Sequence, residues 1–280
     1  MNDFLYKYFP PERSGLLGKS GFFPNFEIAA VSPSMLNDPF ECDLNLICDK
    51  KQYIEYLKTE KAYQDQLEFN RKIGLRTTKA EIKKILRASK KDALKDKDWA
   101  RKQKDNFRKL YEEKGKPQMR ILSLSQNYNS ILMWGHYAKD HKGFIVGFEK
   151  DFLQNEEKDI KNKGWGLREV AYQQEMPSLP FEIDKDEVIF DIPYYTKSNE
   201  WSYEQEVRFV GLAKNTTKQY ELISIDPSSI KSIYLGLQMD SKLKEQIINF
   251  CKEQNLSHVE IFQSIKVKDK YALDFEKISK

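Results

Sequence analysis

The stretch MRILSLSQNYNSILMWGHYAKDHKGFIVGFE, residues 119–149, decides the expected fold. Its first part, MRILSLS, alternates along the chain as a β-strand does. A polar turn, QNYN, separates this strand from SILMWGHYAKD, whose apolar residues suit one face of a helix. GFIVGFE then predicts a second strand. The order strand, helix, strand indicates an α+β domain.

Short apolar runs on both sides of this stretch predict more strands, because they stand between prolines, glycines and other turn residues. EVRFVGL (206–212) alternates directly after a polar turn, and a helix is expected over about 241–255. We therefore expect a mixed or antiparallel central sheet. The other predicted strands are FLYKYF, FEIAAVS, DLNLI, REVAYQ, EVIFDI, ELISI, IKSIYLGL, HVEIFQSIKVK and KYALDF.

Residues from about 49 to 118 have a different composition. Lys, Asp, Glu and Gln dominate, and apolar residues recur at helical spacing, as at Ile82, Ile85 and Leu86. This pattern predicts two or three amphipathic helices, inserted into a single domain that spans 1–280. A charged helical face is most often simply solvated. Whether the insertion is a lid, a partner surface or padding stays open.

Charge and cysteine content exclude several classes of protein. The chain has 47 Lys+Arg against 43 Asp+Glu, so its net charge of +4 is too small to indicate nucleic-acid binding. Its three cysteines form no metal-spaced pair, and an odd number argues against a secreted disulfide framework. No signal peptide or run of about 18 apolar residues is present. We expect a cytoplasmic protein without a membrane partner.

The absence of several motifs narrows the chemistry. The chain contains no G-x-x-x-x-G-K-[ST], no G-x-G-x-x-G after a strand and no G-x-S-x-G. P-loop hydrolysis, Rossmann-type redox chemistry and serine esterase chemistry are therefore disfavoured. It has three histidines and no H-E-x-x-H or His-plus-Cys spacing, so no metal cofactor is expected.

Two polar segments are candidates for a functional site. In the first, Asn37-Asp38-Pro39-Phe40-Glu41, the usual structure is an Asx-type turn, but Glu41 is not explained by that turn. In the second, His136 and Tyr137 follow Trp134-Gly135 on the predicted helix and point in different directions. Either a structural or a ligand-binding histidine is consistent with this position.

A third segment, Glu200 to Arg208, is the most pointed of these constellations. In a strand, Glu204, Glu206 and Arg208 would lie on one face, and Arg208 could pair with Glu206. From the pattern alone, a solvated ladder of ion pairs is the commoner structure.

Five short sequence segments, taken in their order along the chain, resemble a bacterial family catalogued as domain of unknown function 2971. They are LYKYF, MLNDPFEC, LSLS, LMWGHYAKDHKGFIVGFE and KSNEWSYEQEVRF. The resemblance runs from Leu5 to about Phe275, apart from the long charged region before Met119. It implies no established activity.

The layout also resembles, more distantly, that of the ADP-ribosyltransferases. That family has a first strand with a polar residue, a strand with a Ser-x-Ser element, a helix, and a late Glu-x-Glu element that opens a strand. The resemblance implies a split-sheet α+β fold with NAD as co-substrate. LYKYF has no arginine at the first-strand position. The matching positions are Lys7 or Tyr8, then Ser123 and Ser125, then Glu204 and Glu206.

Under this resemblance each candidate has an expected role. Cleavage of the nicotinamide–ribose bond passes through an oxocarbenium-like state, which Glu206 would stabilise while Glu204 positions or deprotonates the acceptor. The serines would hold the ribose. The nicotinamide ring would stack on Tyr8, Tyr137 or Trp201, the pyrophosphate would face Lys7 or Arg208, and His136 is a further candidate for NAD contact. The acceptor would be a nucleic acid or a protein, and the chain a toxin or a phage-defence effector.

Two other functions stay open. A non-catalytic binding module would use Asn37, Asp38, His136, Tyr137, Glu204 and Arg208 as a buried polar network. A metal-dependent nuclease would need Asp38, Glu41, Glu204, Glu206 and one histidine as its site. The acceptor and the oligomeric state are not predicted.

Overall fold

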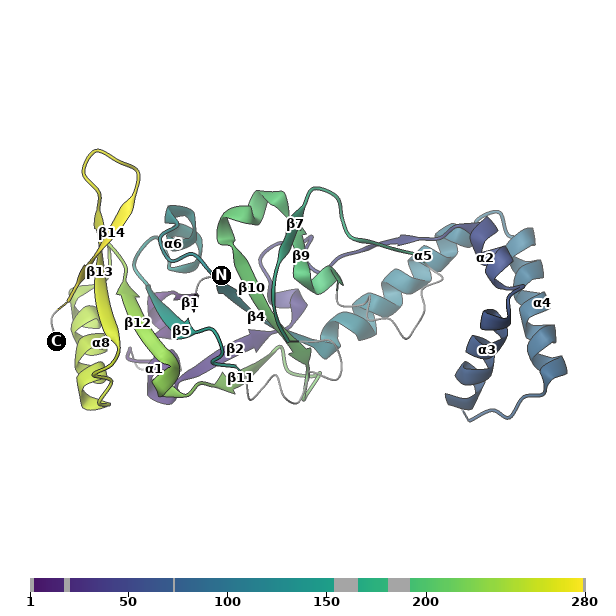
Figure 1. Cartoon of the computed structure of the whole chain (residues 1–280), viewed down its shortest axis with the longest axis horizontal. Coiled ribbons are helices and arrows are strands. Elements are labelled where there is room, and N and C mark those ends of the chain that lie inside the picture. The colour runs from purple at the N-terminus through teal and green to yellow at the C-terminus, as the bar shows by residue number, and fades with distance from the viewer. Residues whose placement is uncertain (1–2, 18–20, 73, 154–165, 181–191, 279–280) are drawn as a thin grey trace. The chain divides into compact units, whose positions relative to one another are not determined.

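The computed structural model describes residues 3–17, 21–72, 74–153, 166–180 and 192–278. The chain divides into two compact units, which are interleaved in sequence (Figure 1). Unit 1 consists of residues 1–42, 116–175 and 191–280. Unit 2 consists of residues 43–115 and 176–190, so it includes most of the charged region together with a second, later segment.

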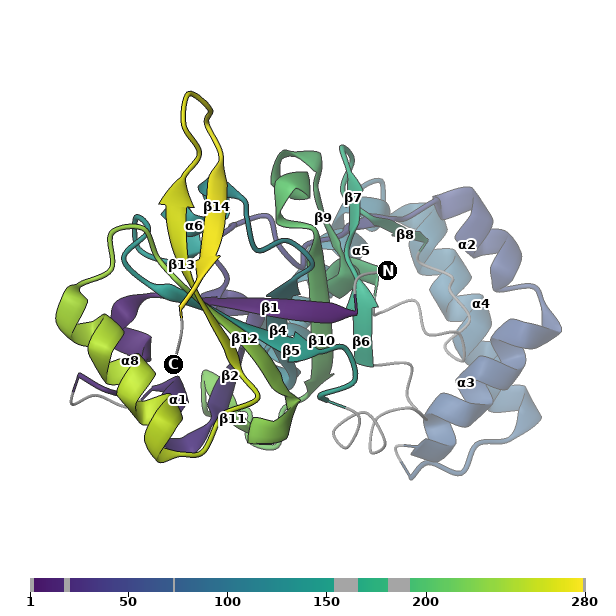
Figure 2. The ribbon, with the colours of Figure 1, turned by 60° about the vertical axis from the view of Figure 1, so that its left-hand side comes forward.

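A sheet of ten described strands forms the centre of unit 1 (Figure 2). The strands are β1 (Phe4–Phe9), β2 (Glu27–Val31), β4 (Met119–Ser125), β5 (Phe144–Glu149), β6 (Gly166–Glu169), β10 (Glu206–Leu212), β11 (Tyr220–Ser224), β12 (Ile230–Leu235), β13 (Glu260–Lys266) and β14 (Leu273–Lys277). The main path runs β11-β2-β4-β1-β5-β12-β13-β14, and β10 pairs with β4 and β6. Within the described residues the pairing is antiparallel except between β12 and β13. The expected mixed, largely antiparallel sheet is confirmed.

The sheet opens on one side of β4. On its other side β4 pairs with β10 along its whole length, from Met119↔Leu212 to Ser125↔Glu206. Its register with β1 is a single pair, Tyr6↔Ser125, and its register with β2 is the single pair Val31↔Ile121. β1 instead pairs with β5 along all of Phe4–Phe9. A gap lined by strand residues is therefore left beside β4.

Apolar side chains cover both faces of this sheet. Helices α1 (Phe22–Asn25) and α8 (Ser241–Glu253) contribute Phe22, Phe23 and Ile247 to the main core cluster. α6 (Ile131–Tyr137) contributes Met133 and Trp134 to a second cluster with the β1 tyrosines. Burying each such large side chain stabilises the fold by about 1.5–3 kcal/mol. β1 stands between β4 and β5 in the strand order and supplies Leu5 and Phe9 to the first cluster and Tyr6 and Tyr8 to the second.

A short parallel ladder precedes β10 in unit 1. β7 (Ala171–Gln173) pairs with β9 (Thr196–Ser198), and β9 follows the 3₁₀ helix η6 (Ile192–Tyr195). A second 3₁₀ helix, η7 (Asn199–Glu204), then leads to β10. REVAYQ, expected as one strand, thus forms the end of β6 and β7, and the predicted strand EVIFDI lies almost entirely outside the described residues.

Unit 2 is mainly helical. Its described residues form α2 (Lys50–Tyr56), α3 (Glu60–Lys72), α4 (Lys79–Lys95) and α5 (Trp99–Leu110), where two or three helices are expected from the sequence. Asp49 caps α2, and Thr78 forms a capping box with Glu81 at the start of α4. β3 (Asn45–Ile47) pairs in parallel with β8 (Ser178–Pro180). No helix among the described residues has the length and apolar content needed to cross a bilayer.

Candidate functional site

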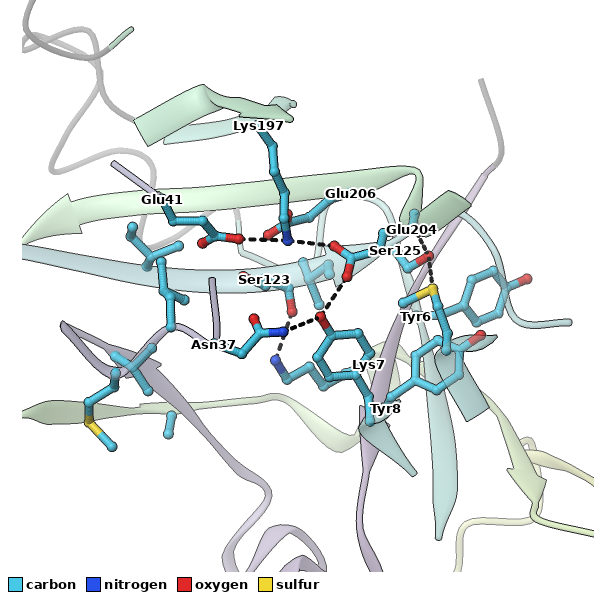
Figure 3. Close-up of a pocket in the computed structure, with 18 residues that line it drawn as sticks. Tyr6, Lys7, Tyr8, Asn37, Glu41, Ser123, Ser125, Lys197, Glu204 and Glu206 are labelled. Atoms are coloured by element: carbon cyan, nitrogen blue, oxygen red, sulfur yellow. Dashed lines mark hydrogen bonds and ion pairs between the residues drawn. The ribbon is translucent and has the colours of Figure 1, made fainter. Parts of the chain in front are cut away.

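A pocket of about 220 Å³ lies in unit 1, beside β4 where the sheet opens (Figure 3). Its lining residues come from β1, β4, β2 and the segment after β2, α6, β9 and the junction between η7 and β10. Its polar lining residues are Tyr6, Lys7, Tyr8, Asn37, Glu41, Ser123, Ser125, Tyr137, Lys197, Glu204 and Glu206. The pocket therefore collects polar groups from segments that are far apart in the sequence.

Three carboxylates meet at one ammonium group in this pocket. Lys197 Nζ lies 2.6 Å from Glu41 Oε1, 2.7 Å from Glu204 Oε2 and 3.4 Å from Glu206 Oε2. None of the four side chains is more than 4% exposed. The ammonium also lies 4.7 Å from the ring centroid of Trp201, within the range of a cation–π contact. The three carboxylates are therefore arranged around the ammonium group of Lys197.

The Arg208 guanidinium forms ion pairs with two of these carboxylates, those of Glu206 and Glu41. Its Nε and Nη2 donate to Glu206 Oε1 and Oε2 at 2.7 and 2.9 Å, and Nη2 lies 3.0 Å from Glu41 Oε2. The predicted Glu206–Arg208 pair is confirmed. The commoner structure for such a pattern, a solvated ion-pair ladder, is wrong here, because the Arg208 side chain is fully buried. Arg208 is not among the residues that line the pocket.

The backbone before β10 differs from the expected strand. Glu204 ends the 3₁₀ helix η7, Gln205 has a left-handed conformation with φ 44° and ψ 52°, and β10 begins only at Glu206. The prediction that Glu204 and Glu206 share a strand face is therefore wrong. Ser125 Oγ donates to the Glu204 carbonyl at 2.6 Å, which fixes this corner against β4. Both carboxylates reach Lys197 because the chain turns sharply between them.

Tyr137 and Asn37 continue the network on the α6 side. The Tyr137 hydroxyl donates to Glu204 Oε1 at 2.5 Å and accepts a hydrogen bond from Asn37 Nδ2 at 3.1 Å. Asp38 Oδ1 accepts the Phe40 backbone N–H at 2.9 Å, so the expected Asx-type turn is present. This turn directs Glu41 into the cluster, which explains why a carboxylate follows the turn.

Burial and neighbouring charges shift the pKa values of Glu206 and Glu41 in opposite directions. Burial alone would raise the pKa of Glu206, but Arg208 and Lys197 outweigh it and lower that pKa to about 2. Burial raises the pKa of Glu41 above its ordinary value despite the same two cations. Each Glu41 oxygen faces one cation, Oε1 facing Lys197 at 2.6 Å and Oε2 facing Arg208 at 3.0 Å, and burial still outweighs them. Glu206 is thus held ionised, whereas Glu41 is the more readily protonated group, a separation typical of acid–base sites.

Lys7 is a second cation in the pocket. Its Nζ crosses from β1 and donates to the Ser123 carbonyl on β4 at 2.8 Å. Burial lowers its pKa to about 8, although Glu206 and Glu204 partly oppose this. Nearby, the Tyr8 hydroxyl donates to the Asn127 carbonyl at 2.8 Å. Lys7 can therefore change charge close to neutral pH while it faces the pocket.

The sequence candidates separate into two groups. Those that line the pocket are Lys7, Tyr8, Asn37, Glu41, Ser123, Ser125, Tyr137, Glu204 and Glu206. Those that do not line it are Asp38, His136, Trp201 and Arg208. His136 is exposed on α6, with its ring centroid 6.5 Å from that of Trp201. The candidates include neither Lys197 nor Tyr172, whose hydroxyl accepts the Glu206 backbone N–H at 2.8 Å. A lone lysine in a lysine-rich chain carries no sequence signal of this kind.

The comparison with known proteins supports one relationship. Residues 133–209 match the family described as protein of unknown function (DUF2971). This match extends from α6 into β10 and includes Tyr137, Lys197, Glu204, Glu206 and Arg208. No curated protein and no solved structure matches the chain. The expected relationship to a family of unknown function is thus supported over these residues.

Proposed function

We propose that the pocket beside β4 binds NAD and that the protein is an ADP-ribosyltransferase or NAD glycohydrolase. One observation supports this most. The three sequence segments expected to match that family's motifs all supply residues to a single pocket, although they lie on β1, on β4 and at the junction between η7 and β10. These residues are Lys7 and Tyr8, Ser123 and Ser125, and Glu204 and Glu206.

The size and position of the pocket favour one part of the dinucleotide. Ligand pockets commonly have volumes of about 300–1,000 Å³. At about 220 Å³ this one is suited to the nicotinamide–ribose half and the pyrophosphate joined to it, with the adenosine outside. Lys7 is the lining cation without a carboxylate in ion-pair contact among the described residues. It would face the pyrophosphate, whose negative charge it can offset.

The carboxylates supply the chemistry that the bond cleavage needs. When the C1′–nitrogen bond breaks, nicotinamide leaves with the electron pair and positive charge develops on the ribose. Glu206, held ionised by Arg208, stabilises that charge. Glu204 orients the acceptor, which is water or a macromolecular nucleophile. Glu41, whose pKa is raised by burial, takes the proton that the acceptor loses when it bonds to C1′.

Nicotinamide release measured by chromatography tests this proposal. The wild type should release nicotinamide from NAD, and Glu206→Gln should lower the rate by about 100-fold or more, since the charge that stabilises the cation is gone. Glu200→Gln is the matched control, because Glu200 is exposed in the same 3₁₀ helix η7. Circular dichroism of each variant verifies folding. Equal release by wild type and Glu206→Gln would contradict the role of Glu206.

A non-catalytic binding module is the second candidate, and one observation favours it. The cluster of Glu41, Lys197, Glu204, Glu206 and Arg208 is almost completely buried and internally paired. Such networks can specify a fold without chemistry. In that case Glu206→Gln lowers thermal stability but leaves every cellular phenotype unchanged.

The carboxylates that a metal-dependent nuclease would need are arranged around a lysine in this structure. Glu41, Glu204 and Glu206 do gather, but Lys197 Nζ stands between them where a cation would bind. No described group of three or more His, Cys, Asp and Glu residues is arranged to hold a metal ion. Nucleic-acid cleavage that a chelator abolishes would favour the nuclease over the NAD-dependent enzyme.

A further inference from the structure

Helix α4 in unit 2 concentrates positive charge. Its sequence, KAEIKKILRASKKDALK, has seven basic residues and two acidic ones. The whole chain, by comparison, has a net charge of only +4. With seven basic and two acidic residues, this one helix of 17 residues has a formal net charge of +5, which exceeds that of the entire chain.

The two faces of α4 differ sharply. Ile82, Leu86 and Ala93 lie on one face at helical spacing, and Ile82 and Ala93 are fully buried where α4 packs with α2 and α3. The other face carries what we call the basic face, consisting of Lys83, Lys84, Arg87 and Lys91, all exposed. Lys83, Arg87 and Lys91 follow one another at intervals of four residues, and Lys84 lies three residues before Arg87, so the four form one stripe along the helix.

The basic face lacks internal partners. None of its four cations has an ion pair or hydrogen bond with any residue in the part of the chain that the structure describes. Glu81, in the first turn of α4, bonds to Thr78 in the capping box, and Lys84 attracts it electrostatically without an ion pair between these two described residues. On α5, by contrast, Arg101, Lys102 and Lys109 each have a carboxylate partner. The charges of α4 are thus available to a partner molecule.

We propose that the basic face of α4 docks on the phosphate backbone of a nucleic acid. Lys83, Arg87 and Lys91 recur about every 6 Å along the helix and span about 12 Å, over which a DNA duplex presents about seven negative charges. Ala80 and Ala88 on the exposed side leave room for close approach. Contacts of this kind depend on phosphates and not on base sequence.

An anionic membrane is the other polyanionic partner to consider, and the packing of α4 argues against it. A helix that lies in a membrane surface inserts a free apolar face between lipids. Ile82 and Ala93 of α4 are buried within unit 2, and its exposed apolar side chains, Ile85 and Leu94, are nine positions apart and so lie on opposite sides of the helix. The basic face is therefore not accompanied by the continuous exposed apolar face that membrane insertion requires.

The inference rests on α4 alone and holds whether or not the pocket of unit 1 binds NAD. If both proposals hold, a nucleic acid is also the first acceptor to examine. Because docking is measured without NAD, a failure of one proposal leaves the other standing.

Fluorescence anisotropy with the full chain and a labelled DNA duplex or single-stranded RNA of about 20 nucleotides tests the proposal. Four phosphate contacts give a slope of about −4 for log affinity against log salt, or roughly a 100-fold loss between 50 and 200 mM salt. The variant Lys83→Glu/Arg87→Glu/Lys91→Glu should lose at least about 10-fold in affinity and flatten the slope by about 3 with duplex DNA. Its neutral counterpart, with Gln at the same positions, should lose less.

The control variant Lys242→Glu/Lys252→Glu/Lys268→Glu makes the same charge change at exposed positions of unit 1. It should retain most of the wild-type affinity. Circular dichroism verifies that α4 remains folded in each variant. Equal losses in the two triple-Glu variants, no binding to either probe, or binding to phosphatidylserine vesicles alone would each overturn the proposal.

Discussion

Replacement of Lys197 by methionine tests how the carboxylate cluster is held together. Lys197 Nζ lies within 3.4 Å of Glu41, Glu204 and Glu206, and none of these side chains is more than 4% exposed. Methionine has a similar length and no charge, so it fills the space without pairing the carboxylates. Arg208 would then be the one cation in ion-pair contact with the cluster among the described residues.

The expected loss follows from this unpaired charge. Breaking a buried ion pair by removal of one partner costs about 3–5 kcal/mol. Since folded domains are stable by about 5–15 kcal/mol, the variant should lose a large part of its free energy of unfolding. With about 3 kcal/mol per molar urea, the upper end for small proteins, the unfolding midpoint should fall by about 1–2 M.

Urea unfolding followed by circular dichroism measures this loss. Lys242→Met, at an exposed position on α8, is the control and should stay within about 0.5 kcal/mol of the wild type. Adding Glu41→Gln to Lys197→Met should restore part of the stability, because it removes one unpaired carboxylate. A loss below about 1 kcal/mol for Lys197→Met would refute the reasoning, because it would mean that the cluster is hydrated.

Three further predictions concern pH and cellular effect. If Lys7 faces the pyrophosphate, NAD affinity should fall as pH rises through its pKa of about 8, whereas Lys7→Arg should show no such fall by calorimetry. The pKa of Glu206 is lowered from 4.5 to about 2, so its contribution to stability should be complete above about pH 4.5 and lost as pH falls toward 2; acid unfolding of Glu206→Gln should lack this component. If the protein is a toxin, its expression in bacteria should slow growth, and Glu206→Gln, unlike Glu200→Gln, should relieve this; growth that is never slowed contradicts the toxin hypothesis.

Local patterns predict much of unit 1. β4, α6 and β5 follow directly from the alternation and helical spacing in residues 119–149, because each depends on near neighbours in the chain. The Asx-type turn at Asp38 is likewise a local property, since its carboxylate bonds to a backbone N–H two residues later. The Glu206–Arg208 ion pair is also local, because the two residues are only two positions apart in the sequence.

The site itself depends on long-range contacts that no local pattern contains. Glu41 and Lys197 come from segments far apart in the sequence. Because they and Arg208 are buried together with Glu206, the Glu206–Arg208 ion pair is not a solvated ladder. Gln205 has a positive φ without being glycine, so the sequence carries no signal for the turn that removes Glu204 from the strand. In the same way, the three-residue strands β3 and β8 pair across a long separation, which short apolar runs cannot indicate.

Isothermal titration of the full chain with NAD tests the central proposal most directly. The proposal predicts binding of one NAD per chain, with an affinity that Lys7→Ala lowers and that Lys242→Ala, an exposed control on α8, leaves unchanged. Absence of binding at millimolar NAD, in protein whose circular dichroism shows that it is folded, would contradict the proposal and would favour a structural role for the buried polar cluster.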